Sequence, residues 1–165
     1  MDLKEQHILV TGASQGIGRA IARELMLHGA RVAAHYNTNP HAAEELISEF
    51  PETKSFVIGG DLEQPQAVSH LFEECTRQMG HLHSMVLNAG VFIPHDVSSP
   101  AASWYATWKK TMAINLDSAG QLTQLGINHF REQGGGRFIY VGSRAAFRGE
   151  TAQYLAYAAS KGGLT

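Results

Sequence analysis

TGASQGIG, at residues 11–18, is the stretch of sequence that decides the fold. It follows a short apolar run, residues 7–11, which we interpret as a buried parallel strand. It leads into a helix on which Ile17, Ile21 and Leu25 recur four residues apart and form an apolar stripe. A glycine pattern between a strand and a helix predicts a dinucleotide-binding turn.

The three glycines of this stretch have separate roles in such a turn. Gly12 allows a tight turn, Gly16 lets the backbone approach a pyrophosphate, and Gly18 lets the helix pack closely on the sheet. The N–H groups and the positive dipole end of the helix then face the phosphates. A glycine-rich turn kept for its geometry alone is the alternative. The cofactor-binding residues predicted here are Gly12, Ser14, Gln15, Gly16, Ile17 and Gly18.

Strand-type and helix-type patterns alternate along the rest of the chain. Predicted strands cover residues 7–11, 31–35, 54–59, 83–87 and 137–141, and predicted helices lie near 17–27, 40–50, 66–79, 102–132 and from 152 onward. Strands joined by helical crossovers predict an α/β fold with a doubly wound parallel sheet (a Rossmann fold) and helices on both faces. We expect a single dinucleotide-binding domain over residues 1–165.

The composition narrows the functional classes. Hydrophobic residues make up 44% and charged residues 17% of the chain, which is typical of a folded globular domain. The net charge of −2 argues against a nucleic-acid partner, and no apolar run is long enough to cross a membrane. Cys75 is the single cysteine, so an internal disulfide is excluded. We expect a cytoplasmic location, because the first residues also lack the apolar core of a signal peptide.

The end of the second predicted strand bears on the choice of dinucleotide. NAD-binding folds usually place an acid there for the ribose 2′-hydroxyl, whereas this chain has His35, Tyr36 and Asn37. Without a carboxylate to repel a 2′-phosphate, NADP(H) is favoured over NAD(H), although Gln15 provides no cation to hold that phosphate. Tyr36 and Asn37 are therefore cofactor-binding candidates. Simple packing of Tyr36 at the strand end is the alternative.

Tyr157 and Lys161 carry the predicted chemistry. Their spacing of four residues places both side chains on one face of a helix. A nearby ammonium favours the phenolate, so the tyrosine can exchange a proton with a carbonyl oxygen. Ser143 follows the fifth predicted strand, and its hydroxyl can hold the same oxygen. A solvent-facing Tyr157–Lys161 pair and a turn-capping role for Ser143 are the alternatives.

Several motifs of the chain occur together in one known family. The chain resembles the short-chain dehydrogenase/reductases, in the branch close to the 3-oxoacyl-carrier-protein reductases, over residues 3–165. The motifs that carry the resemblance are the TGxxxGxG turn at residues 11–18, Asp61, the NAG segment Asn88-Ala89-Gly90, Asn115, Ser143 and the YxxxK motif at residues 157–161.

The resemblance implies further roles. Asp61, with Leu62 beside it, would contact the adenine, and Asn88, Ala89 and Gly90 would border the cofactor. Lys161 would also bind the nicotinamide ribose, and Asn115 would anchor a water that links Lys161 to solvent. A structural role is the alternative for Asn88, whose amide can join neighbouring strands. For Asn115 the alternative is a satisfied polar residue of a helix.

The implied function is an NAD(P)(H)-dependent oxidoreductase that interconverts a carbonyl and an alcohol, with a small-molecule substrate and a homo-oligomeric state, dimer or tetramer. A dinucleotide-binding protein without catalysis, or an inactive fragment, is the alternative. The sequence stops four residues after Lys161, whereas members of the resembled family continue with two more strands. We therefore expect a chain truncated at its C-terminus, with those strands missing.

Several conspicuous residues are assigned no site. His81, His83 and His95 lack neighbouring carboxylates or cysteines at metal-ligand spacing, so no metal site is expected and we interpret them as strand-end and surface residues. Trp104 and Trp108 share a helix face that fits the core or a subunit interface.

Overall fold

Five parallel strands form a single sheet with the order β3-β2-β1-β4-β5. The computed structural model describes residues 3–165. The strands are β1 (His7–Val10), β2 (Arg31–Tyr36), β3 (Phe56–Gly59), β4 (Ser84–Leu87) and β5 (Arg137–Tyr140). The predicted α/β fold with a parallel sheet is therefore confirmed.

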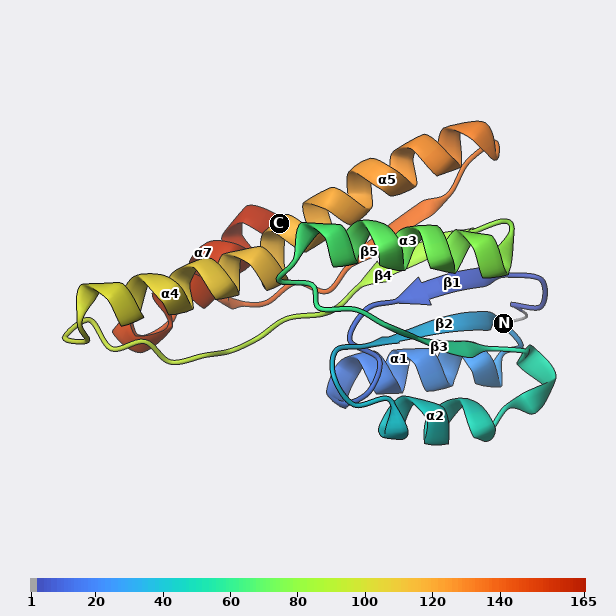
Figure 1. The fold of residues 1–165 in the computed structure, drawn as a ribbon, viewed down its shortest axis with the longest axis horizontal. Coiled ribbons are helices and arrows are strands. Elements are labelled where there is room, and N and C mark those ends of the chain that lie inside the picture. The colour runs from blue at the N-terminus through green and yellow to red at the C-terminus, as the bar shows by residue number, and fades with distance from the viewer. Residues whose placement is uncertain (1–2) are drawn as a thin grey trace.

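Helices cover both faces of this sheet (Figure 1). They are α1 (Gly16–Leu27), α2 (His41–Ser48), α3 (Pro65–Met79), α4 (Ala101–Met112), α5 (Ser118–Glu132), α6 (Ala145–Arg148) and α7 (Leu155–Leu164). Short helical turns lie at η1 (Pro51–Thr53), η2 (Ala113–Asp117) and η3 (Ala152–Tyr154). Figure 1 shows α1 and α2 on one face and α3 and α5 on the other. No helix of residues 3–165 combines the length and apolar character that a bilayer crossing requires.

The core has two layers because successive side chains of a strand point to opposite faces. Leu9 of β1 packs in the cluster that includes Leu71 of α3 and Leu122 of α5. Its neighbour Val10 packs in the other cluster, with Met26 of α1. All four residues of β4 are buried, whereas β5, at an edge of the described sheet, is mostly exposed.

The long helical stretch predicted over residues 102–132 is present. It consists of α4 and α5 with one π-helical turn, η2, between them. Such a turn accommodates an extra residue without ending the helix, and such turns often occur at functional sites. Apolar periodicity cannot resolve one inserted residue, so the sequence pattern did not show η2. The short helix α6 was also missed.

Candidate active site

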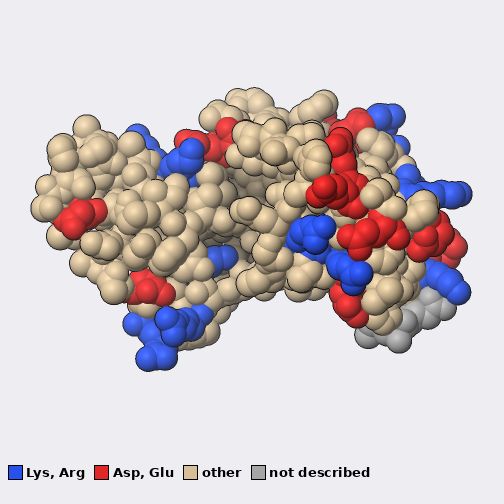
Figure 2. Space-filling view, turned by 90° about the horizontal axis from the view of Figure 1, so that it is seen from below, with Lys and Arg blue, Asp and Glu red and all other residues tan. Residues whose placement is uncertain are grey.

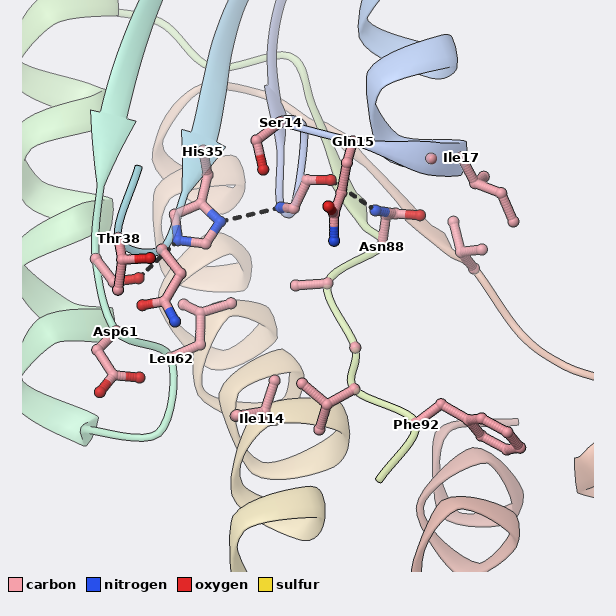
Figure 3. Close-up of a pocket in the computed structure, with 18 of the residues that line it drawn as sticks. Ser14, Gln15, Ile17, His35, Thr38, Asp61, Leu62, Asn88, Phe92 and Ile114 are labelled. Atoms are coloured by element: carbon pink, nitrogen blue, oxygen red, sulfur yellow. Dashed lines mark hydrogen bonds between the residues drawn. The ribbon is translucent and has the colours of Figure 1, made fainter. Parts of the chain in front are cut away.

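A cavity of about 710 Å³ opens at the carboxyl ends of the strands. It lies where the strand order reverses between β1 and β4, the position at which open α/β sheets bind ligands. Figure 3 shows Thr38 and Asp61 at one side of this cavity and Phe92 at another. In Figure 2, charged side chains gather toward the ends of the face shown, and uncharged side chains surround most of the hollow between them.

Most of the predicted site residues line this one cavity. They are Gly12, Ser14, Gln15, Gly16, Ile17, Asn37, Asp61, Leu62, Asn88, Ala89, Gly90, Tyr157 and Lys161. Four predicted residues are not among the lining residues, namely Gly18, Tyr36, Asn115 and Ser143. The residues that sequence reasoning missed are His35, Thr38, Asn39, Gly60, Val91, Phe92, Ile114, Val141 and Gly142.

The glycine turn has the geometry that a pyrophosphate requires. Gly12 and Gly16 have φ angles of 66° and 55°, a region that other residues rarely adopt. A Cβ on Gly16 would meet nothing within 4 Å, so its backbone is open to the cavity. A Cβ on Gly18 would lie 2.2 Å from the Gly12 carbonyl oxygen, so only glycine fits where α1 meets the turn. The cradle therefore fits a dinucleotide.

Hydrogen bonds from the segment that follows β4 hold this turn in place. The Thr11 hydroxyl oxygen accepts from the backbone N–H groups of Asn88 and Ala89, at 2.9 and 3.0 Å. The Asn88 amide donates to the carbonyl oxygens of Thr11 and Gly12, at 2.9 and 3.2 Å. The structural role considered for Asn88 is therefore present in the fold.

His35 is a buried member of the site that sequence reasoning passed over. Its Nδ1 accepts from the Gly12 N–H at 3.0 Å, and its Nε2 donates to the Gly60 carbonyl oxygen at 2.8 Å (Figure 3). Burial lowers the pKa of His35, and the Gly60 bond partly opposes this shift. The available signal was a polar residue near the end of an otherwise apolar strand.

The two cofactor contacts predicted at the end of β2, Tyr36 and Asn37, lie in different surroundings. Tyr36 packs on β3, since a Cβ on Gly59 would lie 2.9 Å from the Tyr36 ring. The packing role considered for Tyr36 is thus the one that the structure shows. Asn37, Thr38 and Asn39 instead line the cavity, and no carboxylate comes from this loop.

Helix α7 brings Tyr157 and Lys161 into the same cavity as the glycine turn. Lys161 is only 4% exposed, and its Nζ donates to the Val141 carbonyl oxygen at 2.9 Å. Burial lowers the pKa of Lys161. The Nζ lies 6.0 Å from the centre of the Tyr157 ring, so the ammonium and the phenol ring face each other.

Asn115 lies behind this pair, within the π-helical turn η2. Its Oδ1 accepts from the Val91 N–H at 2.7 Å. Its Nδ2 donates to the Val91 carbonyl oxygen at 3.0 Å and to the Ser160 hydroxyl at 3.1 Å. Asn115 therefore joins the segment after β4 to α7. The water predicted between Asn115 and Lys161 stays a prediction.

Ser143 and Tyr157 line different cavities. Ser143 lines a second cavity with Phe147 and Thr165, and Gly142 borders both cavities. Its Oγ accepts from the Ala145 N–H at 3.2 Å, which is the turn-capping contact considered from the sequence. Its contact with a substrate oxygen stays a prediction.

His95 corrects the interpretation of the histidines as strand-end and surface residues. It is 4% exposed, and its Nε2 accepts from the Ala156 N–H of α7 at 3.1 Å. Its ring lies 4.9 Å from that of Trp104. His95 thus caps the helix that carries Tyr157, a tertiary contact that no local pattern reveals. Within residues 3–165, no group of three or more possible ligands is arranged to hold a metal.

Comparison with known proteins gives the same family as the one that the sequence motifs resemble. The sequence model of the family described as short chain dehydrogenase matches residues 6–165. A short-chain type dehydrogenase/reductase of Picea abies is 34% identical over 163 residues, covering 93% of this chain and 59% of the relative. Human 15-hydroxyprostaglandin dehydrogenase [NAD(+)] is 33% identical over 161 residues, covering 94% of this chain and 56% of the relative.

A solved structure is similar over almost the whole chain. The NADPH-dependent 3-quinuclidinone reductase of Rhodotorula rubra superposes with a TM-score of 0.85 at 26% identity, covering 99% of this chain and 62% of that chain. This chain spans less than two thirds of the length of the relatives that it matches. The fold, the glycine turn and the family match agree, and the chain belongs to the short-chain dehydrogenase/reductase family.

Proposed function

We propose that this chain carries the dinucleotide-binding and proton-transfer site of an NAD(P)(H)-dependent oxidoreductase that interconverts a carbonyl and an alcohol. The observation that carries the proposal is the position of Tyr157 and Lys161, which line the same cavity as the open backbone of Gly16. A proton donor and a dinucleotide cradle therefore share one space. Family membership supports an oxidoreductase activity.

The residues of this chain divide the work between holding the dinucleotide and moving a proton. The glycine turn would hold the pyrophosphate, Asp61 and Leu62 would border the adenine, and Lys161 would bind the nicotinamide ribose. When bound, the nicotinamide supplies or accepts the hydride.

Tyr157 would donate its phenolic proton to a ketone oxygen, or remove the proton of an alcohol in the reverse direction. The Lys161 ammonium, whose Nζ lies 6.0 Å from the centre of the Tyr157 ring, would assist this proton transfer. Asn115 would keep α7 in position and anchor a water near Lys161. Ser143 would hold the substrate oxygen from the adjoining cavity.

For the cofactor, we propose a preference for NADP(H) over NAD(H). Asn37, Thr38 and Asn39 border the cavity where NAD-binding folds usually have an acid. These side chains offer hydrogen-bond donors and no negative charge to a 2′-phosphate. The solved relative is named as NADPH-dependent and the human relative as NAD(+)-dependent, so both preferences occur among similar proteins.

The remaining assignments are proposals of the same kind. We propose a small-molecule substrate, a homo-oligomer (dimer or tetramer) and a cytoplasmic location. We also keep the predicted place in the branch close to the 3-oxoacyl-carrier-protein reductases. The motifs of the chain support the proposed branch, and the family match supports a small-molecule substrate.

The test replaces Tyr157 with Phe in the full-length protein and follows oxidation of NADPH and NADH with a panel of ketones. We expect turnover to fall by about a hundredfold or more, because the proton donor is lost. Dinucleotide affinity should change little, since the ring remains. Tyr105→Phe on α4 is the matched control, because Tyr105 lies outside this cavity. Equal turnover by wild type and Tyr157→Phe would contradict the role proposed for Tyr157, whereas dinucleotide binding by wild type with no turnover would leave a binding protein without catalysis.

A further inference from the structure

His35 joins two segments of the cofactor site that are far apart in the sequence. Gly12 belongs to the glycine turn after β1, and Gly60 follows β3. The imidazole lies between them, accepting from the Gly12 N–H through Nδ1 and donating to the Gly60 carbonyl oxygen through Nε2. Figure 3 shows both bonds running to opposite sides of the ring.

The two partners fix the protonation state of this ring. A carbonyl oxygen can only accept, so the hydrogen is on Nε2. An N–H group can only donate, so Nδ1 must be bare to accept from Gly12. His35 therefore fits its surroundings in one neutral tautomer, and protonation of Nδ1 would break the bond to Gly12.

Loss of the acceptor His35 Nδ1 would leave the Gly12 N–H without this hydrogen bond. The side chain of His35 is buried, and water has little access to replace it. The bond between Gly12 and His35 is partly buried, and an N–H group shielded from water is destabilising when it has no acceptor. Glycine adopts positive and negative φ about equally readily, so hydrogen bonds such as this one are needed to keep Gly12 at its φ of 66°.

The other end of the bridge meets the segment proposed to contact adenine. Gly60 immediately precedes Asp61, and its own N–H donates to the Tyr36 carbonyl oxygen at 3.1 Å. The backbone N–H of Ala13 donates to the His35 carbonyl oxygen at 2.7 Å. The main chain and side chain of His35 thus both hold the glycine turn, and the side chain also joins this turn to the loop that follows β3.

We propose that His35, as the neutral Nε2–H tautomer, is a positioning residue that sets the geometry of the glycine turn for the dinucleotide. This inference rests on the proposed dinucleotide-binding function. It concerns affinity for the dinucleotide and makes no claim on proton transfer at Tyr157.

Two variants separate the two bonds of the ring. In His35→Asn, the amide oxygen can occupy the place of Nδ1 and accept from Gly12, while the reach to Gly60 is lost. In His35→Gln, the longer side chain can reach Gly60, while no acceptor remains at the Nδ1 position. Dissociation constants for NADPH and NADH, measured by titration calorimetry, are the readout, with thermal unfolding as a check on folding.

We expect His35→Gln to weaken dinucleotide binding by about tenfold or more and His35→Asn to keep it within about threefold. Equal loss in both variants would show that the ring acts only by its volume, and equal affinity in wild type and His35→Gln would show that the Gly12 bond is unimportant. Either result overturns the inference. If wild type binds no dinucleotide, it is the proposed function that fails.

The pH dependence of NADH affinity tests the same inference without relying on His35→Gln. Burial lowers the pKa of His35 below its ordinary value of 6.5, so the ring is neutral at pH 7 and takes up a proton only on further acidification. Affinity for NADH should then fall, and His35→Asn should lack this step. Other titratable groups that line the cavity are Asp61, Tyr157 and Lys161, and both proteins contain them. An identical acid limb in both proteins would contradict the inference. NADH is used because it lacks a 2′-phosphate, which titrates near pH 6.

Discussion

The chain contains two tyrosine–lysine pairs with the same spacing on two different helices. Tyr105 and Lys109 form one pair on α4, with the Lys109 Nζ 4.7 Å from the centre of the Tyr105 ring. Tyr157 and Lys161 form the other pair on α7, with the corresponding distance at 6.0 Å. Judged by contact within the pair, the α4 pair is the closer one.

The surroundings distinguish the two pairs. Tyr105 is 52% exposed and Lys109 is also exposed, so water solvates both polar ends. Lys161 is buried, bonded to the Val141 carbonyl oxygen, and borders the cavity with Tyr157. The spacing brings a phenol and an ammonium together on any helix, whereas the packing of α7 places its pair in the cavity that the glycine turn also lines.

The largest effect expected from this comparison comes from the lysines. Lys161→Met should reduce turnover by about a hundredfold or more, because the charge beside Tyr157 is lost, whereas Lys109→Met should leave turnover unchanged. Steady-state kinetics of both variants with NADPH and a ketone panel measure the difference. Similar losses in both variants would remove the distinction between the two pairs.

The lowered pKa of Lys161 gives this comparison a pH signature. Its ammonium loses the proton at a lower pH than a free lysine does, whose pKa is near 10.5. Wild-type turnover should therefore fall as the pH rises through that lowered pKa. The residual activity of Lys161→Met should lack this limb, and Lys109→Met should retain it.

An intermediate effect is expected at the anchor of α7. Asn115→Leu removes the bonds to Val91 and Ser160 and leaves the Val91 N–H and carbonyl without these partners. The free energy of unfolding should fall by about 2–3 kcal/mol. Asn128→Leu, at an exposed position of α5, is the control and should stay within about 0.5 kcal/mol of wild type. Denaturant unfolding measures both, and equal stability of the two variants would refute the anchoring role.

The smallest effect is expected at the cap of α7. His95→Leu removes the acceptor of the Ala156 N–H and should cost about 1 kcal/mol, the typical value of a helix cap. His95→Gln can place an oxygen near the position of Nε2 and should recover part of this loss. Thermal unfolding compares the two, and a Leu variant as stable as wild type would show that the cap contributes nothing.

Much of the fold could be predicted from the chain because its signals are local. The glycine turn, the apolar strands and the stripe of α1 each involve neighbouring residues, and the parallel sheet followed from their alternation. The π-helical turn η2 could not be predicted, since the apolar pattern of residues 102–132 continues across it. The capping role of His95 could not be predicted either, because its partner Ala156 is 61 residues away.

The candidate site shows the same division. By itself the sequence determined which residues have the chemistry: three glycines for a phosphate turn, and Tyr157 with Lys161 for proton transfer. Only the tertiary structure decided which of them share a cavity: it includes His35, packs Tyr36 on Gly59 and places Ser143 in the adjoining cavity. The physical reason is that side-chain type and helix spacing are properties of short segments. Burial, and the hydrogen-bond partner of a strand-end residue, depend on which distant segment packs against it.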